Sequence, residues 1–254
     1  MLHPEKCFSL LKRYEKASEN YRKFSMKVLG TVECEGSRFP ITAIEIGKGS
    51  KVLVATGIHG DEPAAPEALI RFIESKNAPS FLRGFHVTIF PILNPIGFAK
   101  NTRKNGKIDL NRHYGCRRLH KENRIVEEYV KSKKYDMMIS LHEDVDMDSF
   151  YMYETGCFDA ERFRDTITDD LRFLNLLRKR GFRINCDREI YGIINRGGIK
   201  IVPKDKGRNL ERYLWSRGIV KRVVCIESPG KTEFEKRVEI QILALRHFLK
   251  SFIV

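Results

Sequence analysis

The sequence lacks the features that would assign it to several common classes of protein. Its six cysteines are scattered, without close pairs or Cys-x-x-Cys spacing, which argues against a zinc finger and against a dense disulfide framework. No run of about eighteen apolar residues occurs, and the N-terminus lacks the long apolar core of a signal peptide. The default expectation is therefore a reduced, cytoplasmic protein that does not contact a membrane.

Negative charge is in the minority. The chain has 47 Lys and Arg against 33 Asp and Glu, which gives a formal net charge of +14. The basic residues are spread along the whole length rather than gathered in one arm, and no RNA- or DNA-binding motif is present. A non-catalytic, basic nucleic-acid-binding protein is therefore the weakest alternative. Two interpretations of the charge stay open: a positive field that favours carboxylate-bearing substrates, and an ordinary solvated basic surface.

Internal repeats and low-complexity linkers are also absent, and 254 residues suffice for one large core. Short apolar runs alternate with amphipathic helical patterns, which predicts an α/β fold: a single domain over residues 1–254, with a mixed β-sheet flanked by helices on both faces. Residues 1–25 are predicted to form an N-terminal helical extension on the outside of the fold, with its helix over about 8–24. Strands are predicted at 27–32, 39–46, 52–55, 85–91, 136–141, 150–153 and 223–226, and helices at 63–74, 122–133, 160–180, 210–215 and 234–252.

Four segments are predicted to be loops. Residues 93–98 contain an Asn-Pro dipeptide and a glycine, which mark a loop. Residues 191–208 are rich in glycine and charge, as expected of a mobile loop over a site. The acidic run 143–148 is expected to be a solvated loop. Residues 100–114 have almost no apolar periodicity but many anion-binding groups, and a long polar loop within a compact domain is more often functional than filler.

Three of the predicted strands end beside a residue that can bind a metal or carry a proton. His59 and Glu62 lie on the turn after the run 52–55, His142 follows the run 136–141, and Glu227 follows the run 223–226. Open α/β sheets place their ligands at this edge. An isolated His-x-x-Glu pair is usually no more than two surface polar residues, so the interpretation depends on all four residues meeting.

If they do meet, their chemistry is that of a catalytic zinc site. His59, Glu62 and His142 offer two imidazole nitrogens and a carboxylate oxygen, and would leave the fourth tetrahedral position to water. Glu227 is then better interpreted as a general base than as a ligand, because a carboxylate beside that water can take its proton and deliver it to a departing amine. The alternative for Glu227 is a solvated surface glutamate.

The ordered pieces of this pattern resemble the zinc carboxypeptidase family and the related group of succinylglutamate desuccinylase and aspartoacylase. The resemblance implies one zinc ion per chain, held by His59, Glu62 and His142, with Glu227 as catalytic base and acid. The matching pieces are His59-Gly60-Asp61-Glu62, Asn94-Pro95-Ile96-Gly97, residues 102–112, Leu141-His142 and Ile226-Glu227.

The resemblance also gives roles to residues within 100–114, which we call the polar segment. Arg103 resembles the arginine that polarises the scissile carbonyl and holds the oxyanion, and Asn111 with Arg112 resembles the pair that clamps the terminal carboxylate of the substrate. Asp109 resembles the carboxylate that orients the first zinc histidine. The physics agrees, since a guanidinium binds a carboxylate in bidentate fashion and a fixed cation favours a developing oxyanion. The alternative is a solvated loop with ordinary surface charge.

One departure concerns the tyrosine that, in the carboxypeptidases, caps the substrate from a mobile loop about twenty residues before the base. Residues 201–208 contain no tyrosine, so the resemblance leaves that contact unassigned. The expected function is a zinc-dependent metallocarboxypeptidase or peptide amidase that acts on small peptides with a free carboxylate, such as murein-type peptides. The alternative within the same chemistry is an N-acyl amino acid deacylase. The sequence does not separate the two, and it does not give the oligomeric state.

Overall fold

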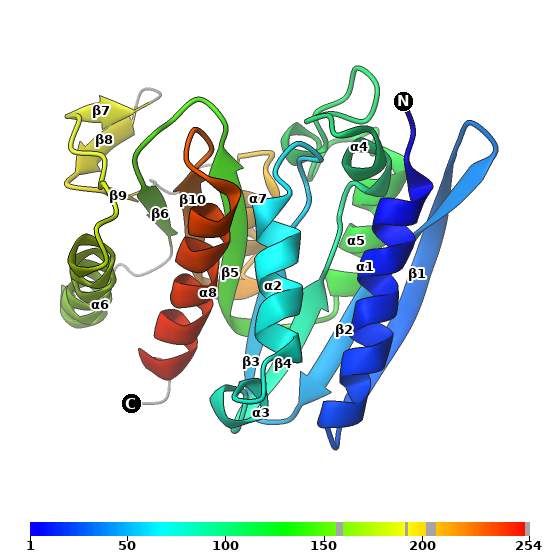
Figure 1. Ribbon diagram of the computed structural model, residues 1–254. Coiled ribbons are helices and arrows are strands. Elements are labelled where there is room, and N and C mark those ends of the chain that lie inside the picture. Colours follow the sequence, from blue (N-terminus) through cyan, green and yellow to red (C-terminus); the bar gives the residue numbers. More distant parts are fainter. Residues whose placement is uncertain (156–159, 191–192, 202–206, 252–254) are drawn as a thin grey trace.

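The computed structural model describes residues 1–155, 160–190, 193–201 and 207–251. In this part of the chain a ten-stranded mixed sheet runs in the order β1-β2-β4-β3-β5-β10-β6-β9-β8-β7 (Figure 1). The strands are β1 Phe24–Cys34, β2 Ser37–Gly47, β3 Ser50–Ala55, β4 Phe85–Phe90, β5 Tyr135–Asp144, β6 Tyr151–Thr155, β7 Glu189–Ile190, β8 Ile193–Arg196, β9 Ile199–Ile201 and β10 Val220–Pro229.

Helices cover both faces of this sheet. In Figure 1, α1, α2 and α8 lie in front of it, and α5 and α7 lie behind. The α-helices are α1 Pro4–Ala17, α2 Ala64–Glu74, α3 Ala78–Phe81, α4 Pro95–Lys100, α5 Lys121–Val130, α6 Ala160–Lys179, α7 Leu210–Ser216 and α8 Phe234–Ser251, and the 3-10 turns are η1 Ser18–Asn20 and η2 Leu110–Arg112. The predicted fold class, a mixed sheet flanked by helices on both faces, is confirmed.

The centre of the sheet is parallel. Strands β4, β3, β5 and β10 are parallel neighbours, and antiparallel β2 and β6 adjoin them on the two sides. These central strands are the near-continuous apolar runs of the sequence, and such runs are typical of strands that are buried on both faces. Their C-terminal ends therefore come together at one edge of the sheet. None of the described helices combines the length and the apolar character needed to cross a bilayer.

The N-terminal segment differs from its prediction. The helix begins at Pro4 and ends at Ala17, and the chain is already in strand β1 from Phe24. Tyr14 is fully buried in the main core, and α1 packs against α2 and α4. A pattern of apolar residues among many charges indicates an amphipathic helix, but it does not say how deeply the apolar stripe is covered.

Three predicted loops are also partly wrong. Residues 95–100 form α4, because the Asn94 side chain accepts a hydrogen bond from the Gly97 amide and Pro95 suits the first helical position. Residues 191–208 include strands β8 and β9, while 191–192 and 202–206 lie outside the described residues. The acidic run begins inside β5, where buried Glu143 accepts a hydrogen bond from the Ala64 amide and pairs with Arg237.

Candidate active site

The loop that follows β3 carries His59 and Glu62 into contact with the next elements. Gly60 packs directly against the backbone of α4: a Cβ atom at this position would lie 1.9 Å from the carbonyl carbon of Gly97. The Gly60 amide also donates to the Thr102 carbonyl. The close approach therefore requires glycine. It also fixes the path of the loop that carries His59 and Glu62.

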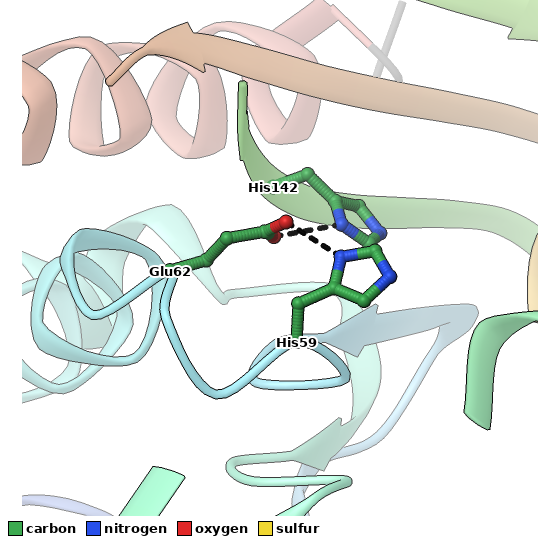
Figure 2. Close-up of side chains that lie close together, drawn as sticks. All are labelled: His59, Glu62 and His142. Carbon is green, nitrogen blue, oxygen red and sulfur yellow. Dashed lines mark hydrogen bonds and ion pairs between the residues drawn. The ribbon is translucent and has the colours of Figure 1, made fainter. Parts of the chain in front are cut away.

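Three side chains from two elements converge on one point (Figure 2). His59 Nδ1 lies 2.5 Å from Glu62 Oε1, and His142 Nδ1, on β5, lies 2.9 Å from Glu62 Oε2. All three residues are buried, and one ligand atom from each lies within 4.8 Å of the others. The structure thus brings together the three residues that the sequence predicted as metal ligands.

The charges of the two histidines and of Glu62 stabilise one another. Burial on its own would lower the pKa of His142, but the Glu62 carboxylate raises it well above its usual value. Burial likewise opposes ionisation of Glu62, and the two histidines overcome this and lower its pKa to about 2. A buried carboxylate of this kind needs positive charge beside it, which a divalent cation would supply in place of protons on the imidazoles.

The donor set fits zinc. Two imidazole nitrogens and one carboxylate oxygen are the ligands that this ion takes in catalytic sites, with one position left open. The remaining ring nitrogen of each histidine faces a carboxylate on its far side: His59 Nε2 lies 3.5 Å from Asp109 Oδ1, and His142 Nε2 lies 3.1 Å from Glu211 Oε1. A carboxylate behind a metal-binding histidine fixes the tautomer that presents the other nitrogen to the metal.

Glu211 is the residue that the sequence did not reveal. It lies on α7, is buried, and accepts a hydrogen bond of 2.6 Å from the Ser140 hydroxyl in addition to its contact with His142. Its neighbours in sequence form an ordinary short helix, capped by the Asn209 side chain. A single glutamate in such a helix resembles any surface carboxylate, so only the packing of α7 against β10, beside β5, shows that it reaches His142.

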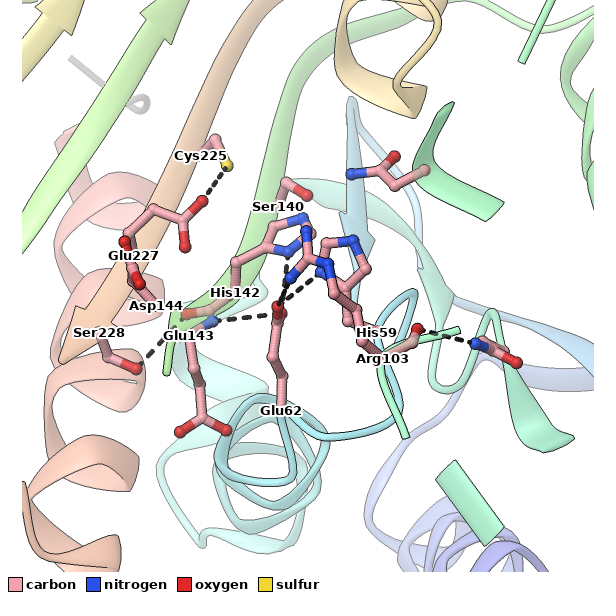
Figure 3. Close-up of polar contacts among 12 residues, drawn as sticks. His59, Glu62, Arg103, Ser140, His142, Glu143, Asp144, Cys225, Glu227 and Ser228 are labelled. Carbon is pink, nitrogen blue, oxygen red and sulfur yellow. Dashed lines mark hydrogen bonds and ion pairs between the residues drawn. The ribbon is translucent and has the colours of Figure 1, made fainter. Parts of the chain in front are cut away.

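The predicted anion-binding residues also reach the site. Arg103 lies over the ligands, with Nη1 3.4 Å from Glu62 Oε1 and Nε 3.5 Å from Asp109 Oδ2 (Figure 3). Asn111 is buried, and its side-chain oxygen accepts from the Leu210 amide at 2.9 Å. Arg112 Nη1 donates to the Asn111 carbonyl oxygen at 2.8 Å. The long polar segment is therefore folded back onto the metal ligands.

Glu227 lies beside this cluster, within β10 rather than after its end. It is paired in register with His142 on the adjacent parallel strand, so the two side chains project from the same face of the sheet. Burial raises the pKa of Glu227 to about 8. Figure 3 shows it together with Cys225 on the strand next to His142.

A cavity of about 310 Å³ opens over these groups. Its walls include both histidines, Glu227 and the cationic side chains of the polar segment, together with residues of β6 and α7. A second cavity, of about 320 Å³, adjoins the other side of the site at Glu143, Asp144 and Asp146. The segment expected to cover the site lies partly in 202–206, outside the described residues.

Comparisons with known proteins identify similar sequences and folds. Residues 48–163 match the family model of the succinylglutamate desuccinylase/aspartoacylase catalytic domain. Carboxypeptidase SOL1 of Arabidopsis thaliana is 30% identical over 118 residues, which are 39% of this chain and 24% of that protein. The chain therefore spans about a quarter of the length of this curated relative.

Solved structures share the fold over nearly the whole chain. A candidate metallopeptidase from Shewanella amazonensis SB2B superimposes with a TM-score of 0.78 at 23% identity, over 97% of this chain and 92% of that one. A metallo-carboxypeptidase from Pseudomonas aeruginosa, in complex with (2-guanidinoethylmercapto)succinic acid, gives a TM-score of 0.66 at 16% identity, over 97% of this chain and 68% of that one. Residues 48–163 are thus similar to the succinylglutamate desuccinylase/aspartoacylase catalytic domain, and the chain shares the fold of these solved metallopeptidase structures.

Proposed function

We propose that this protein is a zinc-dependent hydrolase that cleaves an amide bond next to a free carboxylate in a small peptide. The observation that carries the proposal is the convergence of His59, Glu62 and His142 on one point, with Glu227 in register beside His142. We infer one zinc ion per chain, because the second buried group among the described residues that could hold a metal, His142 with Glu211 and Cys225, shares His142 with the first. When bound, zinc acts as a Lewis acid and makes water nucleophilic near neutral pH.

The substrate's carboxylate would be held by the groups of the polar segment. Arg112 can donate two parallel hydrogen bonds to a carboxylate. The Asn111 side-chain oxygen accepts from the Leu210 amide, which fixes the side chain and leaves its NH₂ group to donate. Arg103, already beside Glu62, would polarise the carbonyl of the scissile amide and stabilise the oxyanion that develops on it.

Glu227 would carry the proton. Its carboxylate takes a proton from the attacking water as the C–O bond forms, and gives it to the amide nitrogen as the C–N bond breaks. The products are a carboxylic acid and an amine, so the step balances with water as the only co-reactant. Burial in a site of mixed charge, which raises the pKa of Glu227 to about 8, suits a group that must both accept and release a proton.

The size of the cavity favours small substrates. About 310 Å³ is at the lower end of the range for small-molecule sites and holds a few residues rather than a folded chain. Murein-type peptides belong to this class, and we include them among the proposed substrates. The positive side chains around the cavity favour substrates that carry carboxylates.

A second candidate is an N-acyl amino acid deacylase, which would use the same residues to release a small acyl group. The specific observation in its favour is the match of residues 48–163 to the succinylglutamate desuccinylase/aspartoacylase catalytic domain. Both candidates hydrolyse an amide whose product side bears a carboxylate, so the metal site does not separate them.

A substrate panel separates them. The purified protein is loaded with zinc, its metal content is measured, and turnover is followed on short peptides, γ-linked murein peptides and N-acyl amino acids, each with its C-terminal amide as a matched control. We expect one zinc per chain and much faster cleavage of free-acid peptides than of their amides. Turnover of N-acyl amino acids without peptide cleavage would favour the deacylase. Salt-sensitive nucleic-acid binding without stoichiometric zinc would contradict both.

A further inference from the structure

Strand β6 adds a row of side chains to the face of the sheet that carries the site. In its antiparallel pairing with β10, Tyr151 lies opposite Glu227 and Tyr153 lies opposite Cys225. On the far side of β6, Lys200 of β9 lies opposite Tyr153. Paired residues project from the same face, so His142, Glu227 and the two tyrosines all line one surface.

Tyr153 stands where the two cavities meet. Five residues line both cavities, namely His59, Arg103, Arg112, Tyr153 and Glu227. Four of these are the proposed metal ligand, oxyanion partner, carboxylate clamp and base. Tyr153 is the fifth, and neither the sequence pattern nor the comparisons give it a role.

The hydroxyl of Tyr153 is held by a buried lysine. Lys200 is 0% exposed, and its ammonium lies 3.1 Å from the Tyr153 oxygen and 2.6 Å from the Ile190 carbonyl oxygen. The same ammonium lies 4.5 Å from the centre of the Tyr153 ring and 4.8 Å from that of Tyr151. These aromatic and carbonyl contacts keep the cation in place where it has little access to water.

The chemistry of this pair sets the direction of the hydrogen bond. An ammonium group has three hydrogens to donate and no acceptor, so the Tyr153 oxygen must accept from Lys200. The phenolic hydrogen of Tyr153 is then directed to a different acceptor. Tyr151 donates its own hydrogen to Asp144 at 2.6 Å and also hydrogen-bonds with Tyr153, so a substrate oxygen would compete with the Tyr151 oxygen for the Tyr153 hydrogen.

We propose that Tyr153 is a substrate-binding residue whose hydroxyl, turned toward the cleft by Lys200, donates a hydrogen bond to a carbonyl or carboxylate oxygen of the substrate. Lys200 is the positioning residue for this contact and does not itself touch the substrate. This inference rests on the proposed hydrolase function, because it needs a substrate that occupies the cleft and places an oxygen acceptor near Tyr153, on the β6 side of Glu227.

The test compares two tyrosines that each lie beside a lysine. Tyr153→Phe removes only the hydroxyl in the cleft. Tyr129→Phe is the matched control, since Tyr129 lies on α5, has Lys133 at 4.3 Å from its ring centre, and donates to Glu45 at 2.8 Å. We expect Tyr153→Phe to lower kcat/KM by about 10- to 100-fold, as for the loss of a hydrogen bond to a charged group, with zinc content unchanged. Tyr129→Phe should leave kcat/KM unchanged.

A double-mutant cycle tests whether Lys200 acts by orienting the Tyr153 hydroxyl. If Lys200 acts by turning the hydroxyl, Lys200→Met lowers kcat/KM in the wild-type background but causes no further loss in the Tyr153→Phe background. Binding of a 2-substituted succinic acid to the zinc-loaded variants, measured by calorimetry, gives a second readout that does not depend on turnover. The same non-additive pattern is expected there.

The outcomes separate this inference from the proposed function. A wild-type protein that takes up no zinc and hydrolyses nothing in the panel overturns both. An active wild type whose kcat/KM is unaffected by Tyr153→Phe overturns the role of Tyr153 alone. Losses from Lys200→Met and Tyr153→Phe that simply multiply overturn the positioning role of Lys200.

Discussion

His142 on β5 and Glu227 on β10 occupy paired positions in neighbouring parallel strands. The backbone around this pair is clamped from α8, because the Gln241 amide nitrogen donates to the His142 carbonyl oxygen at 2.6 Å and lies 2.9 Å from the Ser228 hydroxyl. The distance between the proposed metal ligand and the proposed base is therefore set by the ladder of a buried sheet and not by a loop. Such a rigid setting suits chemistry that depends on fixed geometry.

The carboxylates behind the two histidines should control metal affinity. We expect Asp109→Asn and Glu211→Gln each to weaken zinc binding by about 10- to 100-fold, because each replaces the charged carboxylate behind one histidine with a neutral amide that can also donate. The measurement is competition for zinc with a chromophoric chelator. Glu235→Gln is the control, since this exposed glutamate pairs with Arg71 at the surface. Equal affinities for Glu211→Gln and wild type would show that Glu211 does not support the site.

Gly60 should be intolerant of a methyl group. Gly60→Ala places Cβ against the Gly97 backbone, which cannot move without shifting α4, so we expect a loss of about 1–3 kcal/mol in the free energy of unfolding and a loss of zinc binding. In the control Gly30→Ala, Cβ meets only the flexible side chain of Ile125, at 2.7 Å. Urea denaturation of the two metal-free variants checks the difference. Equal stabilities would contradict the steric argument.

The metal ligands could be predicted because the sequence next to each of them has a recognisable pattern. His59 and His142 follow apolar runs, and the C-terminal ends of parallel strands meet at one edge of a sheet. The same reasoning found Glu227, although both His142 and Glu227 lie inside their strands, β5 and β10, and not beyond the ends. The roles of Arg103, Asn111 and Arg112 were predicted only from the resemblance of their segment to the zinc carboxypeptidase family. The segment has almost no apolar periodicity, so the sequence pattern does not indicate that it lies over the metal ligands.

What could not be predicted depends on contacts between distant elements. Glu211 gains its role only because α7 packs against β10 and so reaches His142 on the neighbouring β5, and Tyr153 gains its role only because β6 pairs with β10. Lys200 lies in a segment rich in glycine and charge, which indicates a loop, yet β9 pairs with β6 and buries the lysine completely. A sequence pattern indicates which side of a segment is buried, but it does not indicate which other segment packs against it.

Arg112 should determine the preference for a free carboxylate. We expect Arg112→Met to raise KM for free-acid substrates by about 10- to 100-fold, with a smaller effect on kcat, because the lost contact is made in both the ground state and the transition state. The measurement is kcat and KM on a matched pair of substrates, one with a free C-terminus and one amidated. If Arg112→Met still prefers the free acid as strongly as the wild type, the clamp lies elsewhere.

A second cluster of buried charges, away from the cavities, should make stability depend on pH. Arg222 binds Glu154 and Asp170, each at 3.0 Å. Burial raises the pKa of Glu154 to about 7, and burial together with the nearby Glu154 carboxylate raises the pKa of Asp170, although Arg222 opposes both effects. Between them the two carboxyls hold a proton in the folded protein at a pH where the unfolded chain has released it.

The sign of this effect follows from the raised pKa values. The folded state binds more protons than the unfolded state between about pH 4.5 and pH 7, so the free energy of unfolding falls as the pH rises through that window. We expect the cluster to contribute roughly 1–3 kcal/mol to this fall, and Asp170→Asn to reduce it. Urea denaturation of both proteins at about pH 5 and about pH 8 makes the comparison. An equal fall in the two proteins would contradict the assignment.

The central claim is that three ligands and one base act on the same water molecule. It is tested most directly by measuring metal content and turnover together in Glu227→Gln, which replaces the base with a neutral group of the same shape and leaves His59, Glu62 and His142 in place. We predict one zinc per chain, as in the wild type, and a loss of turnover of at least about 100-fold. A variant that keeps its zinc and retains wild-type turnover would contradict the account.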